Sequence, residues 1–124
     1  GLDGDDILQG RVDNDVLFGG RGRDTFVFDT KLSGKTNVDR VADFRPGEDT
    51  IRLDDRIFKA LKPGPLTEEA FHVGAAADSN DHILYDRGSG ALSYDPDGSG
   101  SQAPVRFALL HAKLALSATD FLVA

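Results

Sequence analysis

Residues 1–27 fall into three consecutive stretches of nine, GLDGDDILQ (1–9), GRVDNDVLF (10–18) and GGRGRDTFV (19–27). Each nine has glycine at its first position, aspartate at its sixth and a large apolar residue at its eighth. These positions hold Gly1, Gly10 and Gly19, then Asp6, Asp15 and Asp24, and then Leu8, Leu17 and Phe26. So regular a period indicates a coil of repeated structural units, because unrelated turns have no reason to share a spacing.

The residue types in each nine predict a tight loop followed by a short strand. Glycine permits the positive φ that such a loop needs, while inward carbonyl groups and the aspartate carboxylate supply the hard oxygen ligands that Ca²⁺ prefers. We expect the three residues after each aspartate to form a strand whose middle residue points into the core. One turn of the coil then holds two loops and two strands, so each nine stacks on the next but one.

This stacking predicts one complete calcium site, shared by the first and third nines through Asp6 and Asp24. Asp15 lies on the other side of the coil, and we expect its partner loop either upstream of Gly1 or after Phe28. The site would use the carboxylates of aspartates and the backbone carbonyl groups of other residues. The predicted calcium ligands are Gly1, Asp3, Gly4, Asp6, Asp15, Gly19, Arg21, Gly22 and Asp24.

A second set of candidate calcium ligands departs from the pattern. The second nine has Arg11 and Asp13 where glycines are expected, and DPDGSG (95–100) offers oxygen atoms at alternate positions. Arg106 stands twelfth from Asp95, so this segment is not an EF-hand, and a simple solvated turn is the alternative. The second set consists of Gly10, Val12, Asp13, Asp39, Asp43, Asp95, Asp97 and Ser99.

Composition indicates one acidic, globular domain. The chain has 124 residues, 40% of them hydrophobic and 28% charged, which suits a single core. Its net charge is −7, and 18 aspartates with 3 glutamates make up the 21 acidic residues. That sign argues against a nucleic acid partner, and the apolar runs are too short for a membrane span. The chain contains no cysteine and no N-terminal signal peptide. Because it starts at Gly1 without Met, and among the repeats, we expect a fragment of a longer protein.

Beyond the repeats the sequence predicts strands joined by turns, together with two short helices. Alternating apolar residues predict a strand over residues 51–53, a hairpin formed by 82–86 and 91–95, and a strand over 105–109. The expected helices run from a cap at Asp54 or Asp55 to Leu61, and from a cap at Thr67 to Phe71.

With these blocks in view, the whole chain resembles the C-terminal region of RTX (repeats-in-toxin) proteins exported by type I secretion, and especially the serralysin-type C-terminal module. The blocks that carry the resemblance are GGRGRDTFVFD (19–29), VDRVADFRPGEDTIRL (38–53), GALSYDPDGSG (90–100), VRFALL (105–110) and DFLVA (120–124). The resemblance implies an all-β fold. A short parallel β-roll of nonapeptide repeats over residues 1–27 would be capped by a β-rich, largely antiparallel module with one or two short helices over residues 28–124. The two parts would form one continuous structural domain.

The same resemblance implies a location and partners. It implies a secreted, extracellular protein that binds Ca²⁺ and was exported by a type I secretion apparatus. It also implies an uncleaved export signal at the C-terminal end, formed by Asp120, Phe121, Leu122 and Val123. A terminal segment that packs on the core is the alternative for these four residues.

The sequence predicts no catalytic centre. His72, His82 and His111 fall in separate segments without an H-E-x-x-H arrangement, and neither a G-x-S-x-G elbow nor a phosphate loop is present. We therefore expect a non-catalytic domain. The resemblance implies that it folds on Ca²⁺ binding outside the cell and supports export of a larger protein, such as a hydrolase. A calcium-dependent polysaccharide-binding or adhesion module of a secreted enzyme is the alternative, and a regulatory tail of a protease or lipase is a third.

Overall fold

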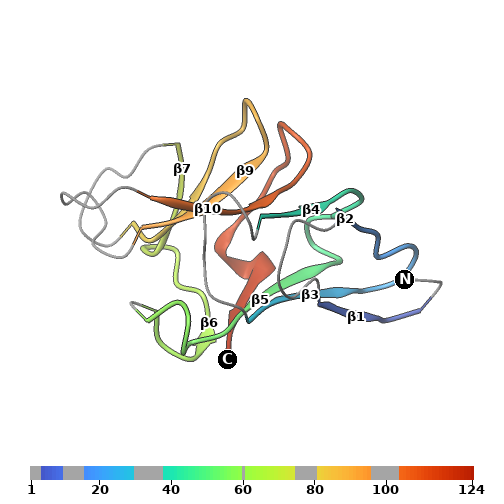
Figure 1. The fold of residues 1–124 in the computed structure, drawn as a ribbon, viewed down its shortest axis with the longest axis horizontal. Helices are drawn as coiled ribbons and strands as arrows, with labels where there is room; N and C mark the ends of the chain where they lie inside the picture. The colour runs from blue at the N-terminus through green and yellow to red at the C-terminus, as the bar shows by residue number, and fades with distance from the viewer. Residues whose placement is uncertain (1–3, 10–15, 30–37, 60, 75–80, 96–103) are drawn as a thin grey trace.

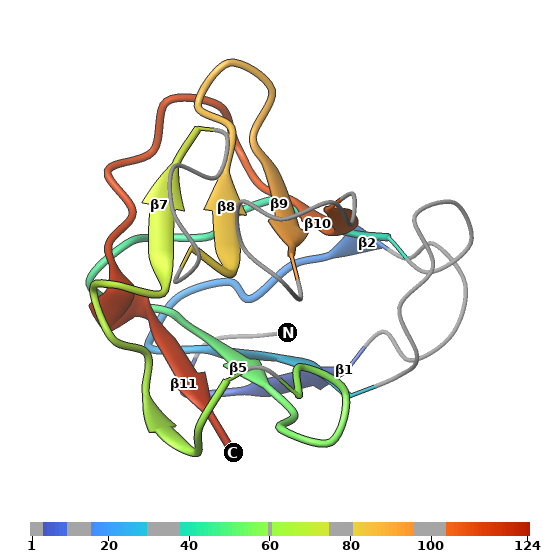
Figure 2. The ribbon, with the colours of Figure 1, turned by 90° about the vertical axis from the view of Figure 1, so that its left-hand side faces the viewer.

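In the computed structural model, two β-sheets lie face to face as two layers (Figures 1 and 2). The structure describes residues 4–9, 16–29, 38–59, 61–74, 81–95 and 104–124. The five-stranded sheet contains, in spatial order, β1 (Ile7–Gln9), β3 (Thr25–Phe28), β5 (Thr50–Leu53), β11 (Phe121–Val123) and β6 (Gly64–Pro65). The six-stranded sheet contains β2 (Val16–Leu17), β4 (Asp39–Val41), β10 (Val105–Leu109), β9 (Ala91–Tyr94), β8 (Ile83–Tyr85) and β7 (Phe71–Val73).

The first five strands alternate between the two sheets. β1, β3 and β5 pair in parallel in one sheet, while β2 and β4 pair in parallel in the other. The nine-residue spacing explains the alternation, because adjacent parallel strands of one sheet need a connection of roughly a dozen residues or more. The chain therefore crosses to the opposite sheet before it returns to its own.

The strand register confirms that the first nine stacks on the third, its next but one. Leu8 stands opposite Phe26, and Phe26 stands opposite Ile51. In the other sheet, Leu17 stands opposite Val41. The strand of the second nine therefore pairs with a strand that follows Phe28. The partner loop predicted for Asp15 stays untested, because Asp15 lies outside the described residues.

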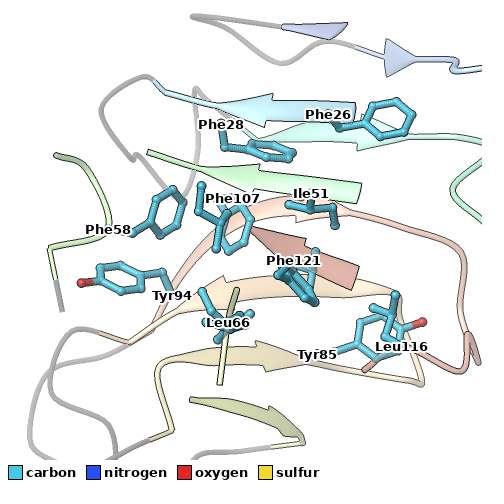
Figure 3. Close-up of a cluster of buried hydrophobic side chains, with 14 of the residues drawn as sticks. Phe26, Phe28, Ile51, Phe58, Leu66, Tyr85, Tyr94, Phe107, Leu116 and Phe121 are labelled. Atoms are coloured by element: carbon cyan, nitrogen blue, oxygen red, sulfur yellow. The ribbon is translucent and has the colours of Figure 1, made fainter. Parts of the chain in front are cut away.

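The core lies between the two sheets and joins the repeats to the rest of the chain. Phe26 and Ile51, both from strands of the five-stranded sheet, are fully buried. Phe107 meets Phe28 and Phe58 edge to face, at centroid distances of 5.2 and 5.1 Å (Figure 3). Such aromatic pairs add stability beyond the burial of each ring. A single buried cluster thus contains side chains from the nonapeptides and from the C-terminal strands.

The C-terminal half confirms the all-β expectation. β8, β9 and β10 form an antiparallel meander, as the predicted hairpin and the strand over residues 105–109 require. β10 also pairs in parallel with β4, and β7 pairs in parallel with β8. Both sheets are therefore mixed, and the expectation of a largely antiparallel module after residue 27 is wrong. Strands of that module form the parallel pairs β4–β10, β5–β11 and β7–β8 beside the antiparallel pairs β6–β11, β8–β9 and β9–β10. The described part of the chain contains no helix that is long and apolar enough to cross a membrane.

β11 lies inside the five-stranded sheet although it is the last strand of the chain. It pairs in parallel with β5 and antiparallel with β6. Phe121 and Val123 face the core with 2% and 1% of their surface exposed, whereas Leu122 faces outward and is 39% exposed. This alternation is required of a strand with one buried face.

The predictions of two short helices, after Asp54 or Asp55 and after Thr67, are both wrong. After Asp54 the chain makes single turns, and the Asp54 carboxylate accepts the backbone N–H of Arg56 at 2.9 Å. A side chain that satisfies local N–H groups in this way competes with a helix. From Thr67 one turn leads into β7, whose pairing with β8 fixes an extended backbone. In the described residues the helical structure is limited to a 3₁₀ turn, Ala118–Asp120.

Candidate metal centre

Three loops of matching geometry lead into β1, β3 and β5. Each loop ends in an aspartate directly before its strand and has a glycine with positive φ two residues earlier. The aspartates are Asp6, Asp24 and Asp49, and the glycines are Gly4, Gly22 and Gly47, with φ of 109°, 95° and 86°. The series therefore continues beyond the three nines.

The loop of residues 44–49 was not among the predicted calcium loops. Phe44 and Arg45 occupy the positions where a nine has its first two glycines, so the glycine-rich signature is missing. The remaining signal is the spacing Gly47-x-Asp49-x-Ile51, which reproduces the fourth, sixth and eighth positions of a nine. Only the strand register makes the equivalence plain.

Hydrogen bonds link the three loops into a ladder. The Asp6 N–H donates to Oδ1 of Asp24 at 2.9 Å, and the Asp24 N–H donates to Oδ1 of Asp49 at 3.0 Å. The backbone repeats the step, since the N–H groups of Thr25 and Thr50 donate to the carbonyl oxygens of Asp6 and Asp24, both at 2.8 Å. Asp24 and Asp49 thus each reach back to the preceding loop with one carboxylate oxygen.

The other carboxylate oxygens of Asp6 and Asp24 have no donor within the described part of the chain. Oδ2 of each residue is buried and accepts no hydrogen bond there. Asp24 as a whole is only 1% exposed. A buried carboxylate oxygen without a partner is costly, because it has lost water and gained nothing in exchange. A hard cation removes that cost, since Ca²⁺ is bound by carboxylate and carbonyl oxygens.

The loops of the first and third nines approach each other closely. A Cβ atom added at Gly22 would stand 2.5 Å from the carbonyl oxygen of Gly4. Within the third-nine loop itself, a Cβ atom added at Gly19 would stand 2.4 Å from Oδ2 of Asp24. The Gly4 N–H also donates to the carbonyl oxygen of Arg21 at 3.1 Å. The predicted ligands that these two loops bring together are Gly4, Asp6, Gly19, Arg21, Gly22 and Asp24.

Side chains alone do not make a metal site in the described residues. Those residues contain no group of three or more His, Cys, Asp or Glu arranged to hold an ion. An ion between the loops must therefore draw on backbone carbonyl groups as well. This suits Ca²⁺, which takes about six to eight oxygen ligands from carboxylates, carbonyl groups and water.

Both carboxylate oxygens of Asp43 accept hydrogen bonds from the start of the third-nine loop. Oδ1 accepts the N–H of Gly19 and Oδ2 accepts the N–H of Gly20, both at 2.8 Å. Asp43 belongs to the second set of predicted ligands, and the structure brings it directly against the loop that ends at Asp24.

The remaining predicted ligands lie away from these loops or outside the part of the chain that the structure describes. Asp39 lies at the start of β4 and Asp95 lies directly after β9, and each is 3% exposed. The Asp95 N–H donates to the carbonyl oxygen of His82 at 2.8 Å. Residues outside the described part of the chain are Gly1, Asp3, Gly10, Val12, Asp13, Asp15, Asp97 and Ser99.

Asp120, from the predicted export signal, binds the loop of residues 44–49. Its Oδ1 accepts the N–H of Gly47 at 2.8 Å, and its Oδ2 accepts the N–H of Ser117 at 3.0 Å. Asp120 is 4% exposed, and Phe121 follows it into the core. The C-terminal strand is thereby tied to the last loop of the series.

Negative charge accumulates around the loop that ends at Asp49. Burial raises the pKa of Asp49 above its ordinary value, and repulsion by Asp24 and Asp43 adds to the rise, although hydrogen bonds from the N–H groups of Asp24 and Arg45 oppose it. Within the described part, no ion pair involves any of these three carboxylates. A cation bound nearby would favour their charged forms.

Comparison with known families identifies the N-terminal segment. Residues 1–29 match the family described as the RTX calcium-binding nonapeptide repeat (4 copies), so this segment is an RTX calcium-binding repeat region. The match ends before β4 and before the loop of residues 44–49. A search of curated proteins finds none that matches the chain.

Proposed function

We propose that the chain is a calcium-binding RTX domain whose complete ion site lies between the loops that end at Asp6 and Asp24. The observation that carries this proposal is the pair of buried oxygens without donors, Oδ2 of Asp6 and Oδ2 of Asp24. Both belong to the segment that matches the calcium-binding repeat. The alternation of parallel strands between two sheets supports a short β-roll as the scaffold of this site.

The chain contributes carboxylates and carbonyl groups to this site. Asp6 and Asp24 supply the carboxylates, and Gly19 leaves open the space into which Oδ2 of Asp24 points. Bound Ca²⁺ supplies the positive charge that offsets two carboxylates held close together. The carbonyl groups of Gly4, Gly19, Arg21 and Gly22, with Gly1 and Asp3, complete the proposed ligand set.

The proposed site acts as a gate on folding. Extracellular calcium modules have dissociation constants of about 10⁻⁴ to 10⁻³ M, so the site is empty at the low free Ca²⁺ of a cytosol and filled outside. At tenfold its dissociation constant, an ion adds roughly 1.4 kcal/mol of stability per site. The loop of the first nine therefore closes against the loop of residues 19–24 outside the cell, while the aromatic core keeps the remainder folded.

This gate suits a secreted, extracellular protein exported by type I secretion. Mutual repulsion of the loop carboxylates opposes closure of the first-nine loop before Ca²⁺ arrives, which keeps this part of the chain in the open form that an export channel requires. Asp120, Phe121, Leu122 and Val123 are the proposed export signal. Because Phe121 and Val123 are buried in the folded chain, the secretion apparatus must read this signal before β11 enters its sheet.

We further propose that residues 1–27 form the β-roll stub and residues 28–124 form its cap. The buried cluster that spans both parts supports one continuous structural domain. The role is non-catalytic: the domain serves the export and folding of a larger protein that carries any enzymatic activity.

Calcium titration of the complete chain tests this function. At about 10 mM Ca²⁺ the melting temperature should rise above its value in EGTA, because the ion binds the folded state at a dissociation constant of about 1 mM or below. Asp24→Ala should remove most of this rise, whereas Asp15→Ala should keep more of it. Equal melting temperatures of the unaltered chain in Ca²⁺ and in EGTA would refute the proposal.

A further inference from the structure

The loop of residues 19–24 has neighbours on two sides. On one side is the loop of the first nine, with which it forms the proposed ion site. On the other side is the segment of residues 43–49, which lies beyond the nonapeptides and beyond the family match. Three backbone N–H groups of the loop donate to this second neighbour. Gly19 and Gly20 donate to Asp43, and Asp24 donates to Asp49.

These contacts hold both ends of the loop. Asp43 binds its first two residues, each through a hydrogen bond of 2.8 Å, and Asp49 binds its last residue at 3.0 Å. Hydrogen bonds to a charged acceptor are stronger than those between neutral groups. They matter here because Gly20 and Gly22 adopt positive φ, and a glycine-rich loop loses much conformational freedom when it is ordered.

The carboxylates around this loop divide into two kinds. Both oxygens of Asp43 accept N–H groups, and so do both oxygens of Asp49, since Oδ2 of Asp49 accepts the Arg45 N–H at 2.9 Å. Oδ2 of Asp6 and Oδ2 of Asp24, by contrast, have no donor in the described part of the chain. Backbone N–H groups therefore occupy both carboxylate oxygens of Asp43 and of Asp49. Asp6 and Asp24 each keep one carboxylate oxygen that can bind an ion.

We propose that Asp43 and Asp49 are positioning residues that hold the loop of residues 19–24 in its ion-binding conformation before Ca²⁺ arrives. This inference rests on the proposed calcium-binding function. A loop ordered in advance has less entropy to lose on binding, so the same ligands bind the ion more tightly. Asp43 therefore acts on the affinity of the site without touching the ion, in place of the ligand role that its residue type suggests.

Isothermal titration of the complete chain with CaCl₂ tests this role. Asp43→Ala should raise the calcium dissociation constant by about tenfold or more, because two charge-assisted hydrogen bonds are lost. The number of bound ions should stay the same. Asp43→Asn keeps one oxygen acceptor and should fall between Asp43→Ala and the unaltered chain.

Glu48→Gln is the matched control. It removes one negative charge from the same segment, but Glu48 is exposed, and its one ion pair among the described residues is with Arg45 at 3.7 Å. We expect it to change the dissociation constant by less than about twofold, the effect of a screened surface charge. An Asp43→Ala dissociation constant equal to that of Glu48→Gln would overturn the inference.

Amide spectra of the calcium-free chain provide a readout that a general loss of stability does not mimic. In Asp43→Asn the amide signals of Gly19 and Gly20 should shift and exchange faster with solvent, while those of β9 stay unchanged. Unchanged Gly19 and Gly20 signals would overturn the inference, as would the loss of one bound ion, which would mark Asp43 as a ligand. Should Asp43→Ala fail to fold, Asp43→Asn decides the question. Failure of the unaltered chain to bind Ca²⁺ at all would refute the proposed function instead.

Discussion

At the scale of single residues, the glycine at the fourth position meets one structural demand in the first nine and two in the third. Gly4 and Gly22 both adopt a φ that residues with a side chain rarely take, 109° and 95°. Only Gly22 also faces a neighbouring backbone, because its missing side chain makes room for the Gly4 carbonyl oxygen. A Cβ at Gly4 would meet nothing within 4 Å. The two positions therefore separate backbone strain from close approach.

Gly22→Ala should damage calcium binding more than Gly4→Ala does. Both substitutions incur the left-handed penalty of roughly 1–2 kcal/mol, but Gly22→Ala also pushes the first and third loops apart. Calcium titrations of the two variants provide the comparison, with near-ultraviolet circular dichroism as the readout. Because the chain has no tryptophan, this signal comes from its tyrosine and phenylalanine rings. Equal affinities would mean that the contact between the Gly22 and Gly4 backbones contributes nothing to the site.

At the scale of elements, β11 is the strand whose position departs most from its place in the sequence. It comes last, yet it stands between β5 and β6, and Asp120 before it binds Gly47 in the last loop of the series. Burial alternates along it, with Leu122 facing solvent and its two neighbours facing the core. The C-terminal strand therefore contributes side chains to the apolar core.

Phe121→Ala should lower the free energy of unfolding by about 3–5 kcal/mol, which is the usual cost of removing a buried aromatic ring. Leu122→Ala is the control in the same strand, and we expect it to cost less than about 1 kcal/mol because the side chain is partly in solvent. Urea unfolding in saturating Ca²⁺ gives both values. Similar losses from the two variants would contradict the assignment of one buried and one exposed face.

The sequence predicted the elements that carry a regular pattern, namely the nines and the alternating strands of the meander, and misjudged elements that lack one. The pairing of Leu8 with Phe26 follows from the period of nine, since a regular coil leaves few alternatives. The loop that ends at Asp49 could not be recognised, because its glycines are replaced at the first two positions and only its stacking on β3 reveals it. The helix predicted after Asp54 failed because its apolar spacing is produced by turns that point Phe58 inward, a tertiary effect with no local signal.

At the scale of the whole molecule, one apolar core joins two parts of the chain. One part should need Ca²⁺ to stay folded, and the other should not. β9 and β10 are held by an antiparallel ladder and by buried rings such as Phe107. β1 has only β3 as a neighbour in the described sheet, and its Ile7 is 70% exposed. Local stability should therefore fall toward the first nine.

Removal of Ca²⁺ should leave the C-terminal strands folded and release the loop of the first nine. Hydrogen exchange in EGTA should show lost protection for the amides of β1 and Thr25, with β9 and β10 little changed, because regions with few buried contacts open first. Adding Mg²⁺ in place of Ca²⁺ should restore less protection, since Mg²⁺ demands octahedral geometry and gives up water reluctantly. Uniform loss of protection across both parts would contradict this division.

The two sheets also differ in what their edges permit. In the part of the chain that the structure describes, β1 and β2 form neighbouring edges whose Ile7, Val16 and Phe18 are 70%, 59% and 56% exposed. At the opposite edge of the five-stranded sheet, β6 carries Pro65, which has no N–H to offer an incoming strand. Strand addition therefore has a direction: a designer could lengthen this protein by whole nine-residue pairs at β1 and β2, and would find the β6 edge closed.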